Sequence, residues 1–124
     1  MTDLLLRTYA DCASDAEAAE ITRCIIQTAA PFGCEPSSTP APYWKIKHLW
    51  GFTFRLYPPT RRTLDEIVAL TNDGWVHSGG PTDPSAVWNR SRDCVFLTPQ
   101  VAWASLDLIP DGAYDADTPR GQMN

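Results

Sequence analysis

Apolar and polar positions alternate over residues 3–12, and this pattern predicts a strand. Successive side chains of a strand point to opposite faces, so even-numbered and odd-numbered residues separate. One face would carry Leu4, Leu6, Thr8 and Ala10, and the other would carry Leu5, Arg7 and Tyr9.

A helix is predicted from Ser14 to about Ala30. Ser14 and Glu17 have the spacing of a capping box, in which each side chain satisfies a backbone amide of the first turn. Apolar residues then recur at helical spacing, and a proline and a glycine end the pattern. The side chains expected to face the core are Ala18, Ile21 and Ile25.

Residues 43–57 predict a hairpin, with strands Tyr43–His48 and Phe52–Tyr57 joined by a turn at 49–51. Alternation would direct apolar side chains inward and basic side chains outward. The inward set would be Trp44, Ile46, Phe52, Phe54 and Leu56, and the outward set Lys45, Lys47, Thr53 and Arg55.

The rest of the chain predicts a second helix and further strands. A capping box over Thr63–Glu66 starts the helix, which stops near residues 72–74 and is followed by a short strand at Trp75–His77. Residues 86–89 and 94–97 could pair as a hairpin. In the final strand, 101–109, the side chains Ala102, Ala104, Leu106 and Leu108 alternate with Val101, Trp103, Ser105 and Asp107.

These elements predict an α+β domain with a mostly antiparallel sheet and two helices on one face. Their order is β-α-β-β-α-β, the order of ferredoxin-like folds, followed by an extra C-terminal hairpin. Residues 1–110 would form this single domain, and residues 111–124, rich in Asp, Gly and Pro, would form a flexible acidic tail.

Composition and charge narrow the function. The chain has 124 residues and a net charge of −5, which disfavours bulk binding of nucleic acid or anionic lipid. Residues 42–62 nevertheless hold five basic residues and no acidic one. In the predicted hairpin these bases and the aromatic residues face opposite sides, so we expect no binding of nucleic acid.

No run of about 18 apolar residues occurs, and no signal peptide is recognised, so we expect a cytoplasmic protein without membrane contact.

No arrangement of residues predicts catalysis. Cys94, His77 and Asp93 could be drawn as a triad, but a buried thiol and an imidazole at a sheet edge explain them better. We expect no catalytic residue, no cofactor and no metal site. The spacing of the cysteines also fits no metal site and indicates free, mostly buried thiols: Cys12, Cys24, Cys34 and Cys94.

The C-terminal third carries the residue types that most often anchor protein interfaces. If the helices cover the Ala and Leu face of the final strand, Trp103 and Asp107 lie outside. Trp88, Asn89 and Arg90 would lie beside them, if 86–89 pairs with 94–97 and 94–97 lies near the final strand. These five residues are our predicted partner-binding surface. The alternative is that Trp103 is covered and belongs to the core.

The run WNRSRDCVFLTPQVAWASLDL, with the segment ending in Gly74-Trp75, resembles small cytoplasmic immunity proteins of bacterial polymorphic-toxin and contact-dependent growth inhibition systems. The resemblance covers residues 42–109. It implies a protein without catalytic activity that binds and blocks a cognate toxin domain, often a nuclease. It transfers no individual binding residue.

Two other functions stay open. A small ligand-binding or regulatory module would fit the ferredoxin-like order, because fold alone does not determine function. A hydrolase whose site is not visible in the sequence is the second. The genes beside this one distinguish them: a large secreted toxin supports an immunity protein, and metabolic enzymes support a ligand module.

Overall fold

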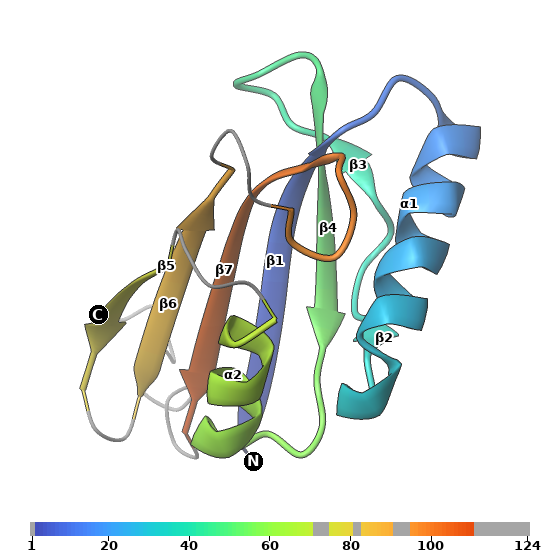
Figure 1. Ribbon diagram of the computed structural model, residues 1–124. Helices are drawn as coiled ribbons and strands as arrows, with labels where there is room; N and C mark the ends of the chain where they lie inside the picture. The colour runs from blue at the N-terminus through green and yellow to red at the C-terminus, as the bar shows by residue number, and fades with distance from the viewer. Residues whose placement is uncertain (1, 71–74, 81–82, 91–94, 111–124) are drawn as a thin grey trace, which may run out of the picture.

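The computed structural model describes residues 2–70, 75–80, 83–90 and 95–110 (Figure 1). The predicted tail, 111–124, lies outside this range. Along the chain the elements are β1 (Asp3–Asp11), α1 (Asp15–Thr28), the 3-10 helix η1 (Ala30–Phe32), β2 (Glu35–Pro36), β3 (Ala41–Pro42), β4 (Leu49–Arg55), α2 (Arg61–Val68), β5 (Trp75–Gly79), β6 (Pro84–Asn89) and β7 (Val101–Ile109).

The strands form one 7-stranded antiparallel sheet in the order β2-β4-β1-β7-β6-β5, with β3 also paired to β4. The predicted α+β class with a mostly antiparallel sheet is therefore confirmed. The first and last strands are neighbours, because Leu6 of β1 lies opposite Phe54 of β4 and Leu106 of β7. This register brings the ends of the described chain together in the middle of the sheet.

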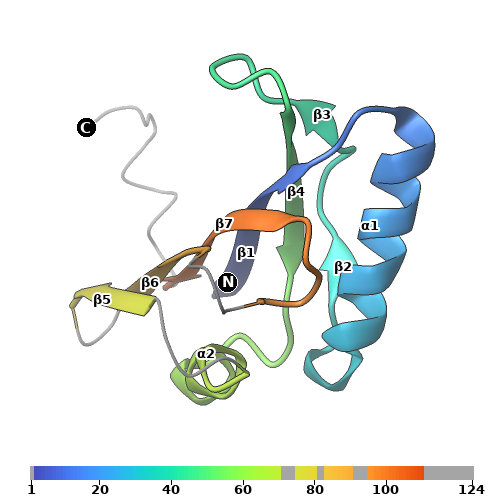
Figure 2. The ribbon, with the colours of Figure 1, turned by 45° about the horizontal axis from the view of Figure 1, so that its top comes forward.

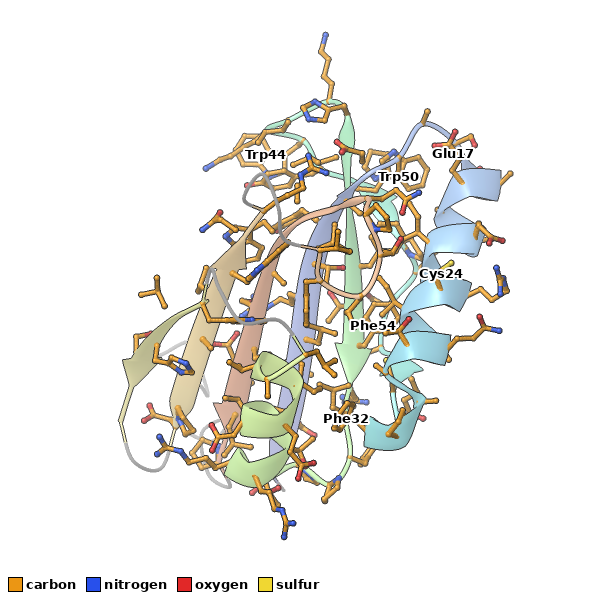
Figure 3. All side chains as sticks on the ribbon, viewed as in Figure 1. Glu17, Cys24, Phe32, Trp44, Trp50 and Phe54 are labelled. Carbon is orange, nitrogen blue, oxygen red and sulfur yellow. The ribbon has the colours of Figure 1, made fainter. Side chains whose placement is uncertain are left out.

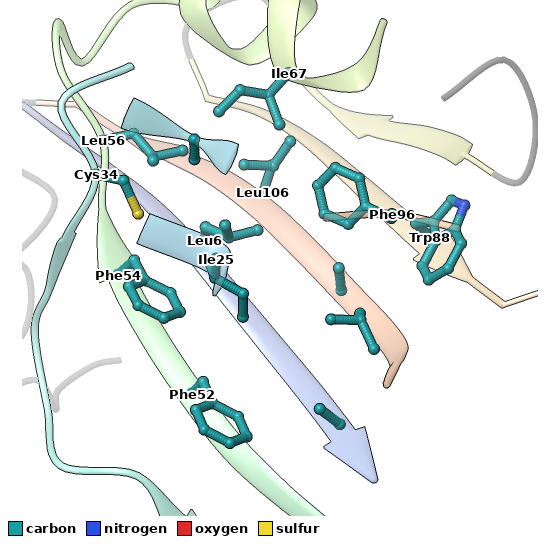
Figure 4. Packing of buried hydrophobic residues seen from close by; sticks show 14 of the residues in the cluster. Leu6, Ile25, Cys34, Phe52, Phe54, Leu56, Ile67, Trp88, Phe96 and Leu106 are labelled. Carbon is teal, nitrogen blue, oxygen red and sulfur yellow. The ribbon is translucent and has the colours of Figure 1, made fainter. Parts of the chain in front are cut away.

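Period-two alternation places one face of this sheet in the core. Leu4, Leu6, Thr8 and Ala10 are each no more than 1% exposed, as predicted for β1. The neighbouring strands contribute Phe52, Phe54, Ala86, Trp88, Ala104 and Leu106 to the same core (Figure 4). We call this the covered face.

Helix α1 begins as the sequence predicts. The Ser14 hydroxyl accepts a hydrogen bond from the Glu17 amide at 3.2 Å, and the Glu17 carboxylate accepts one from the Ala13 amide at 2.9 Å. Both bonds satisfy amides that lack a partner within the helix. The buried residues of α1 are Ala18, Ile21 and Ile25, as expected from their spacing.

Helix α2 begins one turn earlier than predicted. Its N-cap is Thr60, whose side chain accepts from the Thr63 amide at 3.3 Å, and Thr63 is itself 3% exposed inside the helix. The cap predicted at Thr63 is therefore wrong. Thr60 provides the same kind of acceptor three residues earlier, and the earlier start leaves Leu64 and Ile67 buried against the sheet.

Both helices cover the same face, as predicted. Ile25 of α1 and Ile67 of α2 join the core cluster that contains Leu6 and Leu106 (Figure 4). The loop that precedes β7 adds Phe96, whose ring centroid lies 5.6 Å from that of Trp88. Residues 95–100 therefore form part of the same layer as the helices, and Figure 1 shows this loop in front of β1 and β4.

The predicted strand at Tyr43–His48 is not a strand. This segment is a connection between β3 and β4, in which the Tyr43 amide donates to the Leu49 carbonyl at 2.8 Å. Trp44 is 81% exposed and Ile46 is 41% exposed, so neither points into the core. The alternation of Lys and apolar residues imitates a strand, but β4 pairs with residues 41–42 instead.

The predicted pairing of residues 86–89 with 94–97 is also wrong for the described residues. Strand β6 pairs with β5 on one side and β7 on the other, so no position beside it is left for that hairpin. In the segment 95–97, Phe96 forms a single bridge with Thr98. Cys94 lies outside the described residues.

Candidate functional site

The second face of the sheet has no described helix packed against it, and we call it the uncovered face. Its residues are the odd-numbered ones of β1 and their cross-strand neighbours. Three of the rows that they form across the sheet are Asn89, Trp103, Tyr9, Gly51 and Ala41; Val76, Val87, Ser105, Arg7 and Thr53; and Ser78, Ser85, Asp107, Leu5 and Arg55.

An aromatic groove lies at one end of this face. The Tyr9 ring centroid is 4.4 Å from that of Tyr43 and 5.2 Å from that of Trp103, so the three rings form a continuous cluster. The groove has a volume of about 320 Å³. Its lining residues are Tyr9, Tyr43, Ile46, Leu49, Asn89, Ala102 and Trp103.

Gly51 provides room for the Tyr9 ring. The two residues are paired across β1 and β4, and a Cβ atom on Gly51 would lie 3.3 Å from Cε1 of Tyr9. Any larger side chain at this position would press on the ring. Gly51 therefore lets Tyr9 lie over β4, where it meets Tyr43.

A β-bulge shapes the opposite wall of the groove. Tyr9 pairs with Trp103 but Ala10 pairs with Val101, so Ala102 is the extra residue in β7. Val101 is consequently buried at 1% exposure, and Ala102 lines the groove. The prediction that Ala102 shares the buried side of Ala104 is wrong, because the bulge interrupts the alternation.

A polar network occupies the middle of the uncovered face. The Asp107 carboxylate accepts hydrogen bonds from Ser85 Oγ at 2.7 Å, Arg7 Nη2 at 3.1 Å and Ser105 Oγ at 3.3 Å. Its charge is therefore largely compensated within the sheet. Asp107 lies four residues along β7 from Trp103, so this network is separate from the groove on the same face.

The connection at residues 43–48, which we call the basic turn, flanks the groove. Figure 2 shows it on the opposite side of β7 from α2. Tyr43 and Ile46 line the groove, whereas Lys45, Lys47 and His48 are exposed. Lys45 Nζ lies 5.1 Å from the ring centroid of Trp44, and Figure 3 shows Trp44 at this end of the molecule.

A charged cluster joins the basic turn to the sheet. The Asp11 carboxylate lies 3.5 Å from Nε2 of His48 and 3.0 Å from Nη1 of Arg90. Arg90 also donates to the Pro99 carbonyl at 3.2 Å, so its guanidinium is held in place from two sides. Arg90 thereby ties the end of β6 to β1 and to the loop before β7.

The predicted partner-binding residues fall into two groups. Trp103 and Asp107 lie on the uncovered face, Asn89 lines the groove, and Arg90 is exposed at its end. Trp88 is fully buried in the core, so its placement on this surface was wrong. It belongs to the covered face because it lies opposite Ala104, whose side chain also points inward.

Sequence reasoning missed Tyr9 and the basic turn as parts of this site. Tyr9 was placed correctly on the odd-numbered face of β1, but nothing local connected it with Trp103, 94 positions later. The alternation over 43–48 predicts a strand, whereas Tyr43 lies in the connection between β3 and β4 and lines the groove. The useful signal was the glycine opposite Tyr9, which marks a place where another group approaches the backbone closely.

The other side chains considered for catalysis or metal binding do not form a common site within the described residues. His77 is exposed on β5, and its imagined partners Asp93 and Cys94 lie outside the described residues. Cys12, Cys24 and Cys34 are free thiols, and burial raises the pKa of Cys34 to about 12. Within the described ranges, no three His, Cys, Asp or Glu side chains gather as a metal site.

Comparisons with known proteins found no match for the chain among family models, curated proteins or solved structures. Among the described residues, neither α1 nor α2 is long and apolar enough to cross a membrane.

Proposed function

We propose that this chain is a cytoplasmic immunity protein, which binds and neutralises a cognate bacterial toxin domain, such as a nuclease, by direct contact. The observation that carries this proposal is the aromatic groove on a sheet face without a described helix. Protein interfaces obtain most of their affinity from a few aromatic and arginine side chains, enclosed by a polar rim. Trp103, Tyr9 and Tyr43 are such a centre.

The sequence resemblance supplies the class of partner. It covers residues 42–109, a range that contains every groove residue except Tyr9. The chain would act by covering the toxin's working surface, so it needs no reaction of its own. This proposal assigns Trp103 as the central anchor and the network of Asp107 as part of its polar rim.

A growth assay tests the proposal. Each candidate toxin domain encoded beside this gene is induced in a bacterial host, with or without co-expression of this chain. We expect growth to be restored, and we expect Trp103→Ala to remove protection. Val76→Ala is a matched control, because Val76 is on the same face and 67% exposed but does not line the groove.

Two results would refute the proposal. One is that the chain neither protects the host nor forms a complex with the neighbouring toxin domain in size-exclusion chromatography. The other is that a folded Trp103→Ala protein protects as well as the natural chain, which would remove the groove from the interface.

The groove also favours a second function, as a small ligand-binding module. A volume of about 320 Å³ lies at the lower end of the range of ligand sites, and aromatic walls with one polar amide are typical of them. A screen of metabolites, read by Trp fluorescence and melting temperature, distinguishes the two functions. Saturable binding that Trp103→Ala removes would favour the ligand module.

A further inference from the structure

The groove has one apolar part and one charged border. Its floor and walls are formed mainly by the rings of Tyr9, Tyr43 and Trp103, and this part has room for one large side chain. Its border is the basic turn, which places Lys45 and Lys47 beside Tyr43 and Ile46 in the chain. A ligand that fills the groove therefore contacts Tyr43 and Ile46 of the segment that also carries these two exposed lysines.

The lysines of the basic turn lack acidic partners. Among the described residues, no carboxylate lies within 4.0 Å of Lys45 or Lys47, and Lys45 instead stacks on the exposed ring of Trp44. By contrast, the carboxylates at this face are already engaged: Asp11 with His48 and Arg90, and Asp107 with Arg7 and two serines. The border of the groove thus carries uncompensated positive charge.

This local charge opposes that of the whole chain, which is −5. A positive patch on an acidic protein attracts a short acidic element, whereas the overall field repels a long polyanion. That contrast favours an acidic protein segment over nucleic acid.

We propose that the groove receives an acidic segment of the partner protein. An aromatic or large apolar side chain of that segment fills the space between Tyr43 and Trp103, and its flanking carboxylates pair with Lys45 and Lys47. This inference rests on the proposed function, because it describes how the toxin domain would be bound. Unlike the proposed function, the preference of the groove for an acidic segment can be tested with peptides and without the toxin.

The first experiment uses the full chain and three labelled peptides. The probe is Glu-Glu-Phe-Glu-Glu, and its comparisons are Lys-Lys-Phe-Lys-Lys and Glu-Glu-Ser-Glu-Glu. We expect the first peptide to shift the indole N–H signal of Trp103 in NMR spectra and to bind roughly tenfold more tightly than either comparison. Equal binding of the Lys-flanked peptide, or no shift at Trp103, would overturn the inference.

A single-stranded RNA of ten nucleotides serves as the competing probe. If RNA shifts Trp103 at lower concentrations than the acidic peptide does, the groove is a nucleic-acid site and the inference is wrong. We expect RNA to bind more weakly, because its extended charge meets the negative field of the chain.

The second experiment uses the toxin complex and separates this inference from the proposed function. Lys45→Gln with Lys47→Gln should weaken the complex roughly tenfold and reduce its salt dependence. Arg61→Gln with Arg62→Gln is the matched control, because it removes the same charge from α2, on the other side of the sheet. If no complex forms with the natural chain, the proposed function fails. If the complex forms and the lysine variant binds normally, this inference alone fails.

Discussion

The two faces of this sheet share the same strands but differ in what lies over them. On the covered face, Phe54 and Trp88 pack beneath helices and the loop at 95–100. On the uncovered face, Tyr9 and Trp103 form an aromatic cluster with no described helix over it. Both faces contain large rings, so ring content does not distinguish a core from a binding surface. The difference lies in the neighbours that the tertiary structure provides.

The polar groups of the two faces differ in the same way. The covered face includes one polar side chain of β1, Thr8, whose hydroxyl donates to the Phe52 carbonyl at 3.2 Å. The uncovered face holds a network of charged groups around Asp107. Buried polar groups must be paired, whereas partly exposed ones can also serve a partner. Whether a carboxylate is available to a partner therefore depends on the groups it already binds as well as on its exposure.

Three tryptophans give the strongest test of this comparison. Trp88 is fully buried, Trp103 is half-buried and Trp44 is 81% exposed. We expect Trp88→Ala to lower the free energy of unfolding by about 3–5 kcal/mol, because it leaves a large cavity. Trp103→Ala should cost about 1–2 kcal/mol and Trp44→Ala less than about 0.5 kcal/mol. Urea denaturation of the three variants measures this order.

The order of the three variants should change when partner binding is measured on folded protein. Trp103→Ala should weaken binding most, by about 2 kcal/mol or more, because it removes the centre of the proposed interface. A stability loss for Trp103→Ala as large as that for Trp88→Ala would show that Trp103 is a core residue, and it would erase the distinction between the two faces.

The network around Asp107 gives the next largest effect. Asp107→Ala should lower the free energy of unfolding by about 1–2 kcal/mol, because it leaves Ser85 and Ser105 without their acceptor. The ion pair with Arg7 adds little, since the Arg7 side chain is 54% exposed. Thermal denaturation measures the change, and Asp65→Ala on α2, which breaks an exposed pair with Arg61, is the control with an expected change near zero. A smaller loss for Asp107→Ala than for the control would show that the network is not structural.

A glycine substitution tests the groove with a smaller change. Gly51→Ala should leave the fold intact and cost less than about 1 kcal/mol, while displacing the Tyr9 ring by a few tenths of an ångström. Partner binding should fall, because the rings of Tyr9 and Tyr43 would no longer meet in the same way. NMR signals of the Tyr9 ring report the displacement. Unchanged ring signals together with unchanged binding would contradict the role assigned to Gly51.

The cysteines give the mildest test, without any substitution. Cys34 is buried against the core and its pKa is raised to about 12, whereas Cys24 is half-buried on α1. Because the thiolate is the reactive form, iodoacetamide at pH 8 should label Cys24 well before Cys34. Peptide mapping by mass spectrometry follows both sites in the same sample. Equal rates would mean that the covered face opens more readily than its packing indicates.

Regular periodicity explains where prediction from the sequence worked. The faces of β1, the capping of α1 and the faces of β7 beyond the bulge depend on contacts within a few residues, and each was predicted correctly. The errors arose where tertiary pairing overruled a local pattern. Tyr43–His48 alternates like a strand, yet the partner of β4 is Ala41–Pro42. Pairing 86–89 with 94–97 predicts an outer position for Trp88, whereas the observed pairing of β6 with β7 turns it into the core.

The sequence by itself determined the α+β class, which face of the sheet the helices cover, and that Trp103 lies on the other face. These features follow from side-chain periodicity. The tertiary structure alone decided that Tyr9, Tyr43 and Trp103 meet, since they come from three distant segments. It also decided that Asp107 is engaged while Lys45 and Lys47 are not. The physical reason is that strand pairing and a bulge bring these groups together, and no local pattern in the chain specifies either.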